Sequence, residues 1–293
     1  MQKDRGAMGA LILSMLIFGT IGILRRHIPL PSGALAFIRG AIGALFLAGV
    51  TAARGKKPDI AAIRRNAPML CLSGACIGFN WMLLFEAYNH TTVATATLCY
   101  YMAPVIVMLL SPVVLREKLT PVKLGCVAVA IAGVALVSGV AEAGFDMSEL
   151  RGALLALGAA ALYACVILMN KRLSGVSAED RTMVQLAAAA IVVVPYSLLA
   201  ENISVAELSW LSIALILVAG VVHTGLAYAM YFGSIEKLSA QSVALLSYID
   251  PIFAVILSAL MLNEPMGATG WVGAILVIGA MMLSELPGRA KPT

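Results

Sequence analysis

The sequence predicts an all-α integral membrane protein with ten transmembrane helices, arranged as two inverted five-helix repeats. Three observations support this fold class. Hydrophobic residues make up 61% of the chain and charged residues only 12%, which is too few to cover a water-facing surface. The charges cluster between apolar runs of transmembrane length. Matching motifs occur once in each half of the chain.

Apolar runs between charged or Pro/Gly-rich breaks define the expected spans, because a helix crossing about 30 Å of hydrocarbon needs roughly 20 residues. The N-terminal run ends at Arg25 and Arg26 without a small-residue cleavage site, so we expect an uncleaved first span. The loops are short, and any activity is therefore expected inside the bilayer. The ten spans are expected at residues 6–24, 32–53, 68–88, 93–114, 122–140, 151–170, 182–199, 209–232, 239–262 and 268–286.

The positions of the basic residues predict the orientation. Of the twenty Lys and Arg residues, Arg25, Arg26 and Arg151 fall on one side of the membrane and Arg39 lies within a span, which leaves sixteen on the other side. Basic loops face the cytoplasm, so we expect both termini to be cytoplasmic in a multi-pass protein of the cell membrane. The net charge of +5 is thereby explained without a nucleic-acid partner.

An internal repeat divides the chain into residues 1–145 and 146–293, which we expect to form one membrane domain. A shift of 147 residues places Tyr101 on Tyr248, Pro104 on Pro251 and Glu117 on Glu264. Five spans per half is an odd number, so the second half must enter the membrane from the opposite side. Inverted repeats with a substrate site near the bilayer midplane are common in secondary transporters.

The repeated motifs resemble those of the EamA-type branch of the drug/metabolite transporter superfamily. The first copy is YYMAPVIVMLLSPVVLREKLT, the second is SYIDPIFAVILSALMLNEPMG, and FIRG holds the arginine of the second span. Cys126 departs from the family, which usually has a glycine there. The resemblance covers essentially the whole chain. It implies a central cavity lined by spans 1–4 and 6–9, spans 5 and 10 at the periphery, and transport of amino acids, other polar metabolites or organic cations by alternating access.

Asp250 is the first candidate site residue, because ionisable groups within spans are costly and often functional. It lies halfway along its span, directly before Pro251, and Tyr248 precedes it by two residues. A proline frees backbone carbonyls, so Pro104 and Pro251 are expected to kink their helices beside a cavity. Asp250 suits a proton carrier or a counter-charge for a cationic group. The alternative is a neutral carboxyl group hydrogen-bonded to a neighbouring helix.

Arg39 and His223 are the other two candidates within spans. Arg39 could bind a substrate carboxylate in a bidentate manner, or it could pair structurally with Glu86 or Glu117 or reach toward an interface. Glu86 is the more accessible of these two partners. His223 could titrate during transport, or it could make an interhelical hydrogen bond.

Polar and aromatic residues of three further spans are expected to line the cavity, although packing is the alternative role for each aromatic. They are Asn80, Trp81, Tyr100, Tyr101 and Tyr163, with Tyr248 beside Asp250. Glu86, Glu117 and Glu264 are expected at helix ends, as interfacial charges or as gates.

Small residues suggest close packing of the peripheral spans. Gly125, Ala128, Ala132, Ala135 and Gly139 are expected to form one packing face of the fifth span, with Gly267, Gly270 and Gly273 in the tenth. The protein is expected to be a monomer, or a homodimer through these spans. An enzyme is not expected, because the three histidines form no H-E-x-x-H motif and no G-x-S-x-G motif occurs. A channel is a further alternative, but no filter-like loop is present. No cofactor or metal is expected; the partners are the lipid bilayer and a small-molecule substrate.

Overall fold

The computed structural model describes residues 2–114, 120–137, 146–204, 208–235, 237–238, 243, 246–264 and 266–285. Within these ranges the chain is helical and contains no strand. The helices are α1 (Gln2–Gly19), α2 (Ile21–Arg26), α3 (Ser32–Ala53), α4 (Ile60–His90), α5 (Val93–Tyr100), α6 (Ala103–Val114), α7 (Pro121–Val137), α8 (Met147–Arg172), α9 (Ala178–Ala200), α10 (Trp210–Leu217), the π-helix η2 (Val218–Leu226), α11 (Ala227–Ile235), α13 (Ile249–Met261) and α14 (Ala268–Glu285). Glu117 and the boundary between residues 145 and 146 fall at or within ranges that are not described.

Among the described residues, seven helical segments are long and apolar enough to cross a membrane. Three shorter apolar helices, Pro121–Val137, Ile249–Met261 and Ala268–Leu283, accompany them. The outer surface is strongly apolar: the side chains of Leu199 and Val113, for example, are 88% and 83% exposed. Such a surface suits contact with lipid, and the expectation of an all-helical membrane fold is confirmed.

Polar side chains fix where several helices begin, by accepting hydrogen bonds from otherwise unpaired backbone N–H groups. The Asp59 carboxylate caps α4 by accepting from the Ala62 N–H at 2.9 Å. The helix therefore begins eight residues before the expected span at 68. Further caps are provided by Thr92 for α5, Asp146 for α8, Ser177 for α9 and Ser209 for α10.

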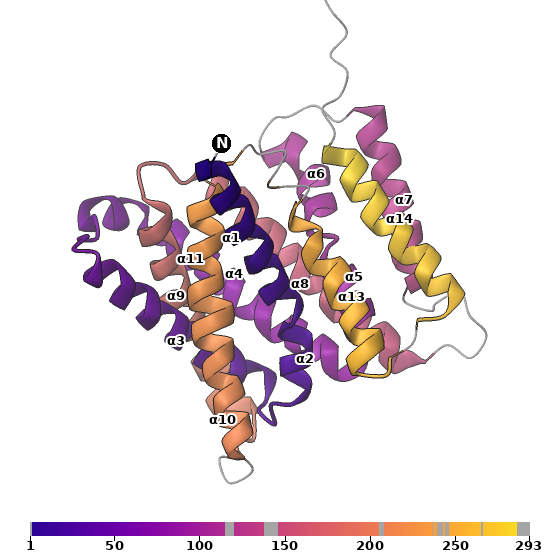
Figure 1. Cartoon of the computed structure of the whole chain (residues 1–293), viewed down its shortest axis with the longest axis horizontal. Coiled ribbons are helices and arrows are strands. Elements are labelled where there is room, and N and C mark those ends of the chain that lie inside the picture. The colour runs from indigo at the N-terminus through magenta and orange to yellow at the C-terminus, as the bar shows by residue number, and fades with distance from the viewer. Residues whose placement is uncertain are drawn as a thin grey trace, which may run out of the picture.

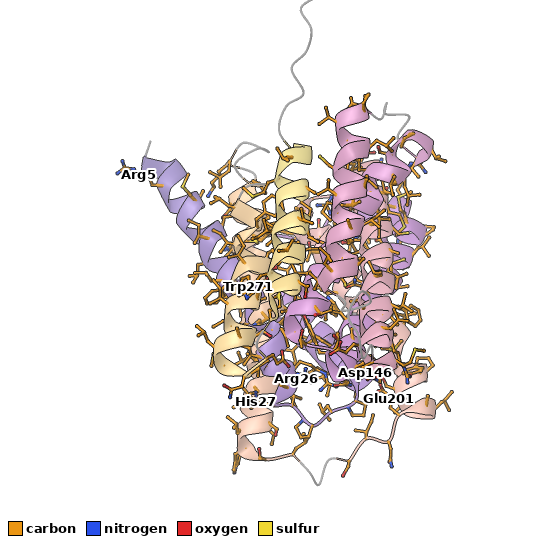
Figure 2. All side chains as sticks on the ribbon, turned by 90° about the vertical axis from the view of Figure 1, so that its right-hand side faces the viewer. Arg5, Arg26, His27, Asp146, Glu201 and Trp271 are labelled. Atoms are coloured by element: carbon orange, nitrogen blue, oxygen red, sulfur yellow. The ribbon has the colours of Figure 1, made fainter. Side chains whose placement is uncertain are left out.

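The helices form a single bundle with α7 and α14 side by side at one edge, away from α3 and α9 (Figure 1). The start of α1 and the end of α14 lie at the same end of this bundle. In Figure 2, Arg5 lies at that end, whereas Arg26, Asp146 and Glu201 lie at the opposite end. The ends of the described chain therefore lie at one end of the bundle.

The packing face of α7 differs from the one that the small residues suggested. Gly125, Ala128, Ala132 and Ala135 are exposed, and Gly139 lies outside the described residues. The buried face instead holds Cys126, Ala130, Gly133 and Val137.

Two glycines explain this correction. A Cβ atom on Gly133 would lie 2.8 Å from the Gly273 carbonyl oxygen, and one on Gly273 would lie 2.6 Å from that of Gly133. The backbones of α7 and α14 thus cross at these two residues, and the crossing rather than the small-residue stripe decides which face is buried. Of the three glycines expected to pack in the tenth span, only Gly273 meets α7.

Two helical breaks occur at equivalent tyrosines. α5 ends at Tyr100, Tyr101 lies outside the helix, and α6 begins at Ala103. Tyr248 likewise precedes α13, with φ −73° and ψ −8°, close to the φ −69° and ψ 1° of Tyr101. Each break lies three residues before a proline, Pro104 or Pro251, whose missing N–H leaves a carbonyl of the preceding turn without its helical partner.

Candidate functional site

A cavity of about 290 Å³ lies between the helices, at the level of these breaks. Lining residues come from α1, α2, α3, α4, α5, α6, α8, η2, α11 and α13. Of the described residues, none from α7, α9 or α14 lines it, so the expectation that the seventh span (here α9) would do so is not met. Its volume is near the lower end of the range for small-molecule sites, roughly 300–1,000 Å³.

The lining is predominantly aromatic. Six of the eight tyrosines of the chain contribute, together with Phe18 and Trp81. The Tyr100 ring lies 5.7 Å from the Tyr163 ring between centroids, and Phe18 packs edge-on against Tyr228 at 5.4 Å. The six tyrosines are Tyr88, Tyr100, Tyr101, Tyr163, Tyr228 and Tyr231.

Asp250 lies in the first turn of α13 and faces the cavity. Its carboxylate Oδ2 accepts a short hydrogen bond from the Tyr101 hydroxyl. Tyr101 terminates α5, so this bond joins the broken helix of the first expected half to that of the second. The hydrogen bond also fits the alternative interpretation, in which Asp250 is a neutral group held by a neighbouring helix.

Arg39 is 5% exposed and lies on α3, within the lining of the cavity. Its Nε donates to the Thr224 hydroxyl at 3.0 Å, and its guanidinium carbon lies 4.2 Å above the Trp81 ring. Among the described residues no carboxylate pairs with it. The alternative in which Arg39 pairs with Glu86 is therefore contradicted.

Glu86 has other partners, which explains why it does not reach Arg39. Its carboxylate accepts from the Ser32 hydroxyl at 2.8 Å, from the Asn89 side-chain amide at 3.0 Å and from His90 at 3.2 Å. These donors lie at the start of α3 and at the end of α4. Glu86 thus stabilises a helix end.

His223 and Thr224 lie in η2, in the middle of the eighth expected span. Nε2 of His223 lies 2.7 Å from the Thr20 hydroxyl and Nδ1 lies 3.4 Å from the Val218 carbonyl oxygen. The Thr20 hydroxyl is also placed to donate to the Ile17 carbonyl oxygen at 2.8 Å. A neutral imidazole can satisfy only two of these three hydrogen bonds, whereas an imidazolium can satisfy all three.

Two of the expected lining residues lie behind the cavity wall. The Asn80 amide donates to the Ala159 carbonyl oxygen at 2.6 Å, and its oxygen lies 3.5 Å from the Tyr100 hydroxyl. Tyr248 is 6% exposed and packs in an apolar cluster with Leu98 and Val277. The remaining expected residues, Asp250, Tyr101, His223, Trp81, Tyr163, Tyr100 and Arg39, are brought together at the cavity.

Five residues at the site were not predicted from the sequence: Phe18, Tyr88, Tyr228, Tyr231 and Thr224. A signal existed for Tyr228, because the shift of 147 residues places it on Trp81. No comparable signal existed for Thr224, whose hydroxyl is directed at Arg39 by the π-helical turn.

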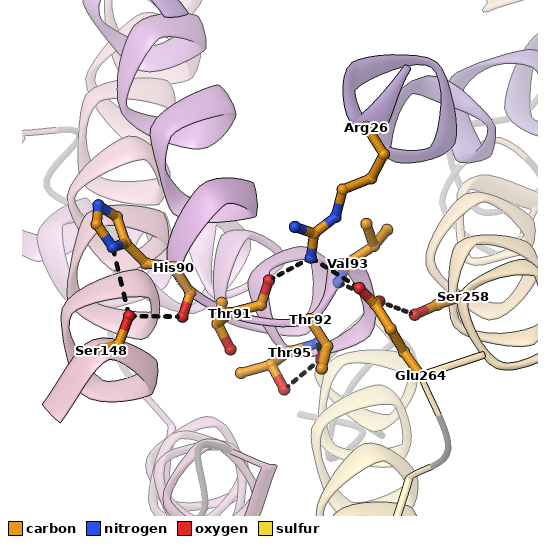
Figure 3. A network of polar contacts seen from close by, with 9 residues as sticks. All are labelled: Arg26, His90, Thr91, Thr92, Val93, Thr95, Ser148, Ser258 and Glu264. Atoms are coloured by element: carbon orange, nitrogen blue, oxygen red, sulfur yellow. Dashed lines mark hydrogen bonds and ion pairs between the residues drawn. The ribbon is translucent and has the colours of Figure 1, made fainter. Parts of the chain in front are cut away.

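A polar network closes the helix ends beyond the cavity (Figure 3). The Glu264 carboxylate, which follows α13, accepts from Arg26 at 2.7 Å, from the Val93 N–H at 2.9 Å and from the Ser258 hydroxyl at 2.6 Å. Arg26 also donates to the Thr91 carbonyl oxygen at 2.9 Å. The network joins α2, α5 and α13 one helical turn beyond Gly22, which lines the cavity.

No group of three or more His, Cys, Asp or Glu side chains in the described part of the chain could hold a metal ion. The side chains that face the cavity are one buried guanidinium, one carboxyl group, one imidazole and an aromatic wall. Such a site can bind a small solute that carries charge.

Comparison with known proteins gives consistent matches. The sequence model described as the EamA-like transporter family matches residues 5–139 and again residues 150–286. The uncharacterized transporter YxxF of Bacillus subtilis is 28% identical over 283 residues, covering 96% of this chain and 90% of that protein. The aromatic amino acid exporter YddG of Ancylobacter novellus is 23% identical over 82% of this chain and 84% of its own.

Two further matches are weaker: one covers only half of the chain, and the other has low sequence identity. The threonine/homoserine exporter RhtA of Salmonella typhimurium is 30% identical over 151 residues, which are 51% of this chain and 50% of that protein. A solved crystal structure superposes with a TM-score of 0.66 and 20% identity, covering 95% of this chain and 96% of the other. The structural match supports the fold.

Proposed function

The chain belongs to the EamA-like transporter family, and from this premise we propose that it is a secondary transporter that moves a small metabolite across the cell membrane by alternating access. The family and the names of its relatives indicate a transporter rather than an enzyme. The observation that carries the proposal is the cavity between the helices, which holds a buried guanidinium and a carboxyl group inside an apolar bundle. Charged groups at such depth are energetically costly, and in membrane proteins they commonly mark the pathway of a solute or an ion.

The proposed architecture has ten spans in two inverted halves, residues 1–145 and 146–293, with both termini in the cytoplasm. The double match to one family model and the equivalent breaks at Tyr101 and Tyr248 support a duplicated unit. The sixteen basic residues expected on one side support the orientation. In this arrangement Arg26 and Glu264 lie at the outer end of the cavity.

We assign the network around Glu264 to the outer gate. It connects α2 of the first half to α13 of the second, so the halves cannot separate at this end while it is intact. Glu86 is a structural residue of the same end. Glu117, the repeat counterpart of Glu264, is proposed as the gate residue of the inner end by the symmetry of the halves.

The substrate class is an amino acid, a related polar metabolite or an organic cation, as the relatives named for aromatic amino acids and for threonine and homoserine suggest. Asp250 is proposed to carry a proton or to face a cationic group, with His223 as a second titrating residue. Helices α7 and α14 are peripheral, and the protein is proposed to act as a monomer or as a homodimer through them.

Proteoliposome transport tests this function. Purified protein is reconstituted and uptake of labelled L-phenylalanine, L-threonine and phenylethylamine is measured with and without a pH gradient. Asp250→Asn is expected to abolish the dependence of uptake on the gradient and to reduce the rate about 10-fold or more. Glu149→Gln is the matched control, since Glu149 is an exposed acid of α8 away from the cavity. Unchanged uptake rate, affinity and pH dependence in Asp250→Asn would remove Asp250 from the mechanism.

A further inference from the structure

Arg39 is a buried cation without a described counter-ion, inside a protein that spans lipid. Its Nε is used by Thr224, whereas neither terminal amino group has a hydrogen-bond partner among the described residues. A buried charge without a partner is energetically costly, because the lost hydration is not replaced. The face of Trp81 at 4.2 Å and that of Phe85 at 5.4 Å offset only part of this cost.

The two unused amino groups form a planar fork that matches a carboxylate. Side-by-side N–H groups of a guanidinium bind two oxygens of one carboxylate or phosphate at once. The cavity also contains Asp250, whose negative charge opposes a doubly charged phosphate. A solute that carries one carboxylate and one ammonium group would instead meet both residues with opposite charge, and the aromatic wall suits an apolar body.

Thr224 orients the guanidinium of Arg39, and the π-helix η2 sets the direction of the Thr224 hydroxyl. The Thr224 hydroxyl donates its only hydrogen to the Ala219 carbonyl oxygen, five residues earlier, at 2.8 Å. Its oxygen is therefore left as an acceptor, which is what the Arg39 N–H requires. In a regular α-helix the hydroxyl would turn toward the carbonyl four residues back, so the wider turn sets the direction of the contact.

Close packing of α3 against η2 makes the contact rigid. Thr224 is fully buried, and a Cβ atom on Gly43 would lie 2.9 Å from the Thr224 Cβ. A Cβ atom on Gly220 would lie 2.6 Å from the Cβ of Ile42. Both glycines allow the two backbones to approach, so Arg39 and Thr224 meet across a fixed interface.

We infer that Arg39 is the carboxylate-binding residue of the cavity, and that Thr224 and Trp81 are positioning residues that direct its two free amino groups toward a small zwitterionic or anionic solute. This inference rests on the proposed transport function and narrows its substrate class. An organic cation without a carboxylate is then a poor ligand. The π-helix becomes an element that determines specificity, through the direction of one hydroxyl.

The three tryptophans of the chain permit a direct binding test. Trp210 and Trp271 are 87% and 44% exposed, so replacing both by phenylalanine leaves Trp81, beside Arg39, as the only indole. This variant in lipid nanodiscs is titrated with L-phenylalanine, 3-phenylpropionate, phenylethylamine and inorganic phosphate while Trp81 emission is followed. L-Phenylalanine and 3-phenylpropionate are expected to bind at least about 10-fold more tightly than phenylethylamine, the scale of a hydrogen bond to a charged group.

Three variants in the same background distinguish the positioning of Arg39 by Thr224 from a general loss of folding or of the cavity. Arg39→Gln is expected to abolish the preference for carboxylates. Thr224→Val, which keeps the shape and loses the acceptor, is expected to weaken both carboxylates about 10-fold and to leave phenylethylamine within about 3-fold. Thr224→Ser keeps the hydroxyl and is expected to stay within about 3-fold of the parent for every ligand.

Four results would overturn the inference: no binding of any carboxylate, equal binding of phenylethylamine, tighter binding of phosphate, or an equal loss of all ligands in Thr224→Val. The test of the proposed transport function is separate from this binding test. If the carboxylates bind as expected and proteoliposomes take up none of the probes, the proposed function fails while the carboxylate site stands.

Discussion

Replacing Glu264 by glutamine should open the end of the bundle that the network in Figure 3 holds together. The carboxylate receives hydrogen bonds at 2.6–2.9 Å from Arg26, Val93 and Ser258, so three helices depend on one side chain. Glutamine has a similar size, but it lacks the charge and one of the two acceptor oxygens. The hydrogen bonds are thus weakened without a large change in packing.

The size of the effect follows from the strength of these contacts. A hydrogen bond to a charged group contributes about 1.5–3 kcal/mol, and the Arg26–Glu264 pair is partly exposed, with side chains 31% and 16% accessible, so solvent screening reduces its share. We therefore expect the closed state to lose about 1–2 kcal/mol relative to the open one. At about 1.4 kcal/mol for each factor of ten, the population of the open state rises roughly 5- to 30-fold.

Labelling of a cysteine in the cavity measures this population. Ala103→Cys places a thiol in the lining, in a background without the five native cysteines. Right-side-out vesicles are treated with a membrane-impermeant maleimide, and the labelling rate is expected to rise 5- to 30-fold in Glu264→Gln, in proportion to the open state.

The matched control is Glu86→Gln. Glu86 lies near the same end, but its three donors, Ser32, Asn89 and His90, all belong to the first half of the chain. It should leave the labelling rate within about 2-fold of the parent. An unchanged rate in Glu264→Gln, or an equal rise in both variants, would refute the idea that this network is a gate between the halves.

Two further predictions concern the site and the fold. Tyr101→Phe removes the donor to Asp250 and should reduce uptake about 10-fold, whereas Tyr196→Phe, on the exposed face of α9, should not; equal uptake by both variants would contradict a role for the bond to Asp250. Gly133→Ala places a Cβ atom 2.8 Å from the backbone of α14 and should destabilise the protein by about 1–3 kcal/mol, seen as a lower melting temperature in detergent. Gly125→Ala is its control, because no atom lies within 4 Å of the added Cβ, and equal melting temperatures would show that the helix crossing is not tight.

The sequence alone predicted the features that depend on the lipid bilayer around the protein. Lipid requires long apolar helices with internally satisfied backbones, so the second span was predicted at 32–53 and α3 covers Ser32–Ala53. The same logic identified Asp250, Arg39 and His223, because a charged or polar side chain stands out in an apolar run. The local chemistry of proline placed the two helical breaks near Pro104 and Pro251.

Tertiary structure decided the features that depend on which surfaces meet. Spacing along α7 favoured the face with Gly125, yet the buried face contains Gly133, because the partner helix α14 offers its own glycine at a matching height. Helix order made Glu86 an accessible partner for Arg39, yet Glu86 is occupied by Ser32 and its neighbours. The direction of a side chain across an interface depends on the backbones of both helices. The residue spacing within one helix carries no information about the helix that packs against it.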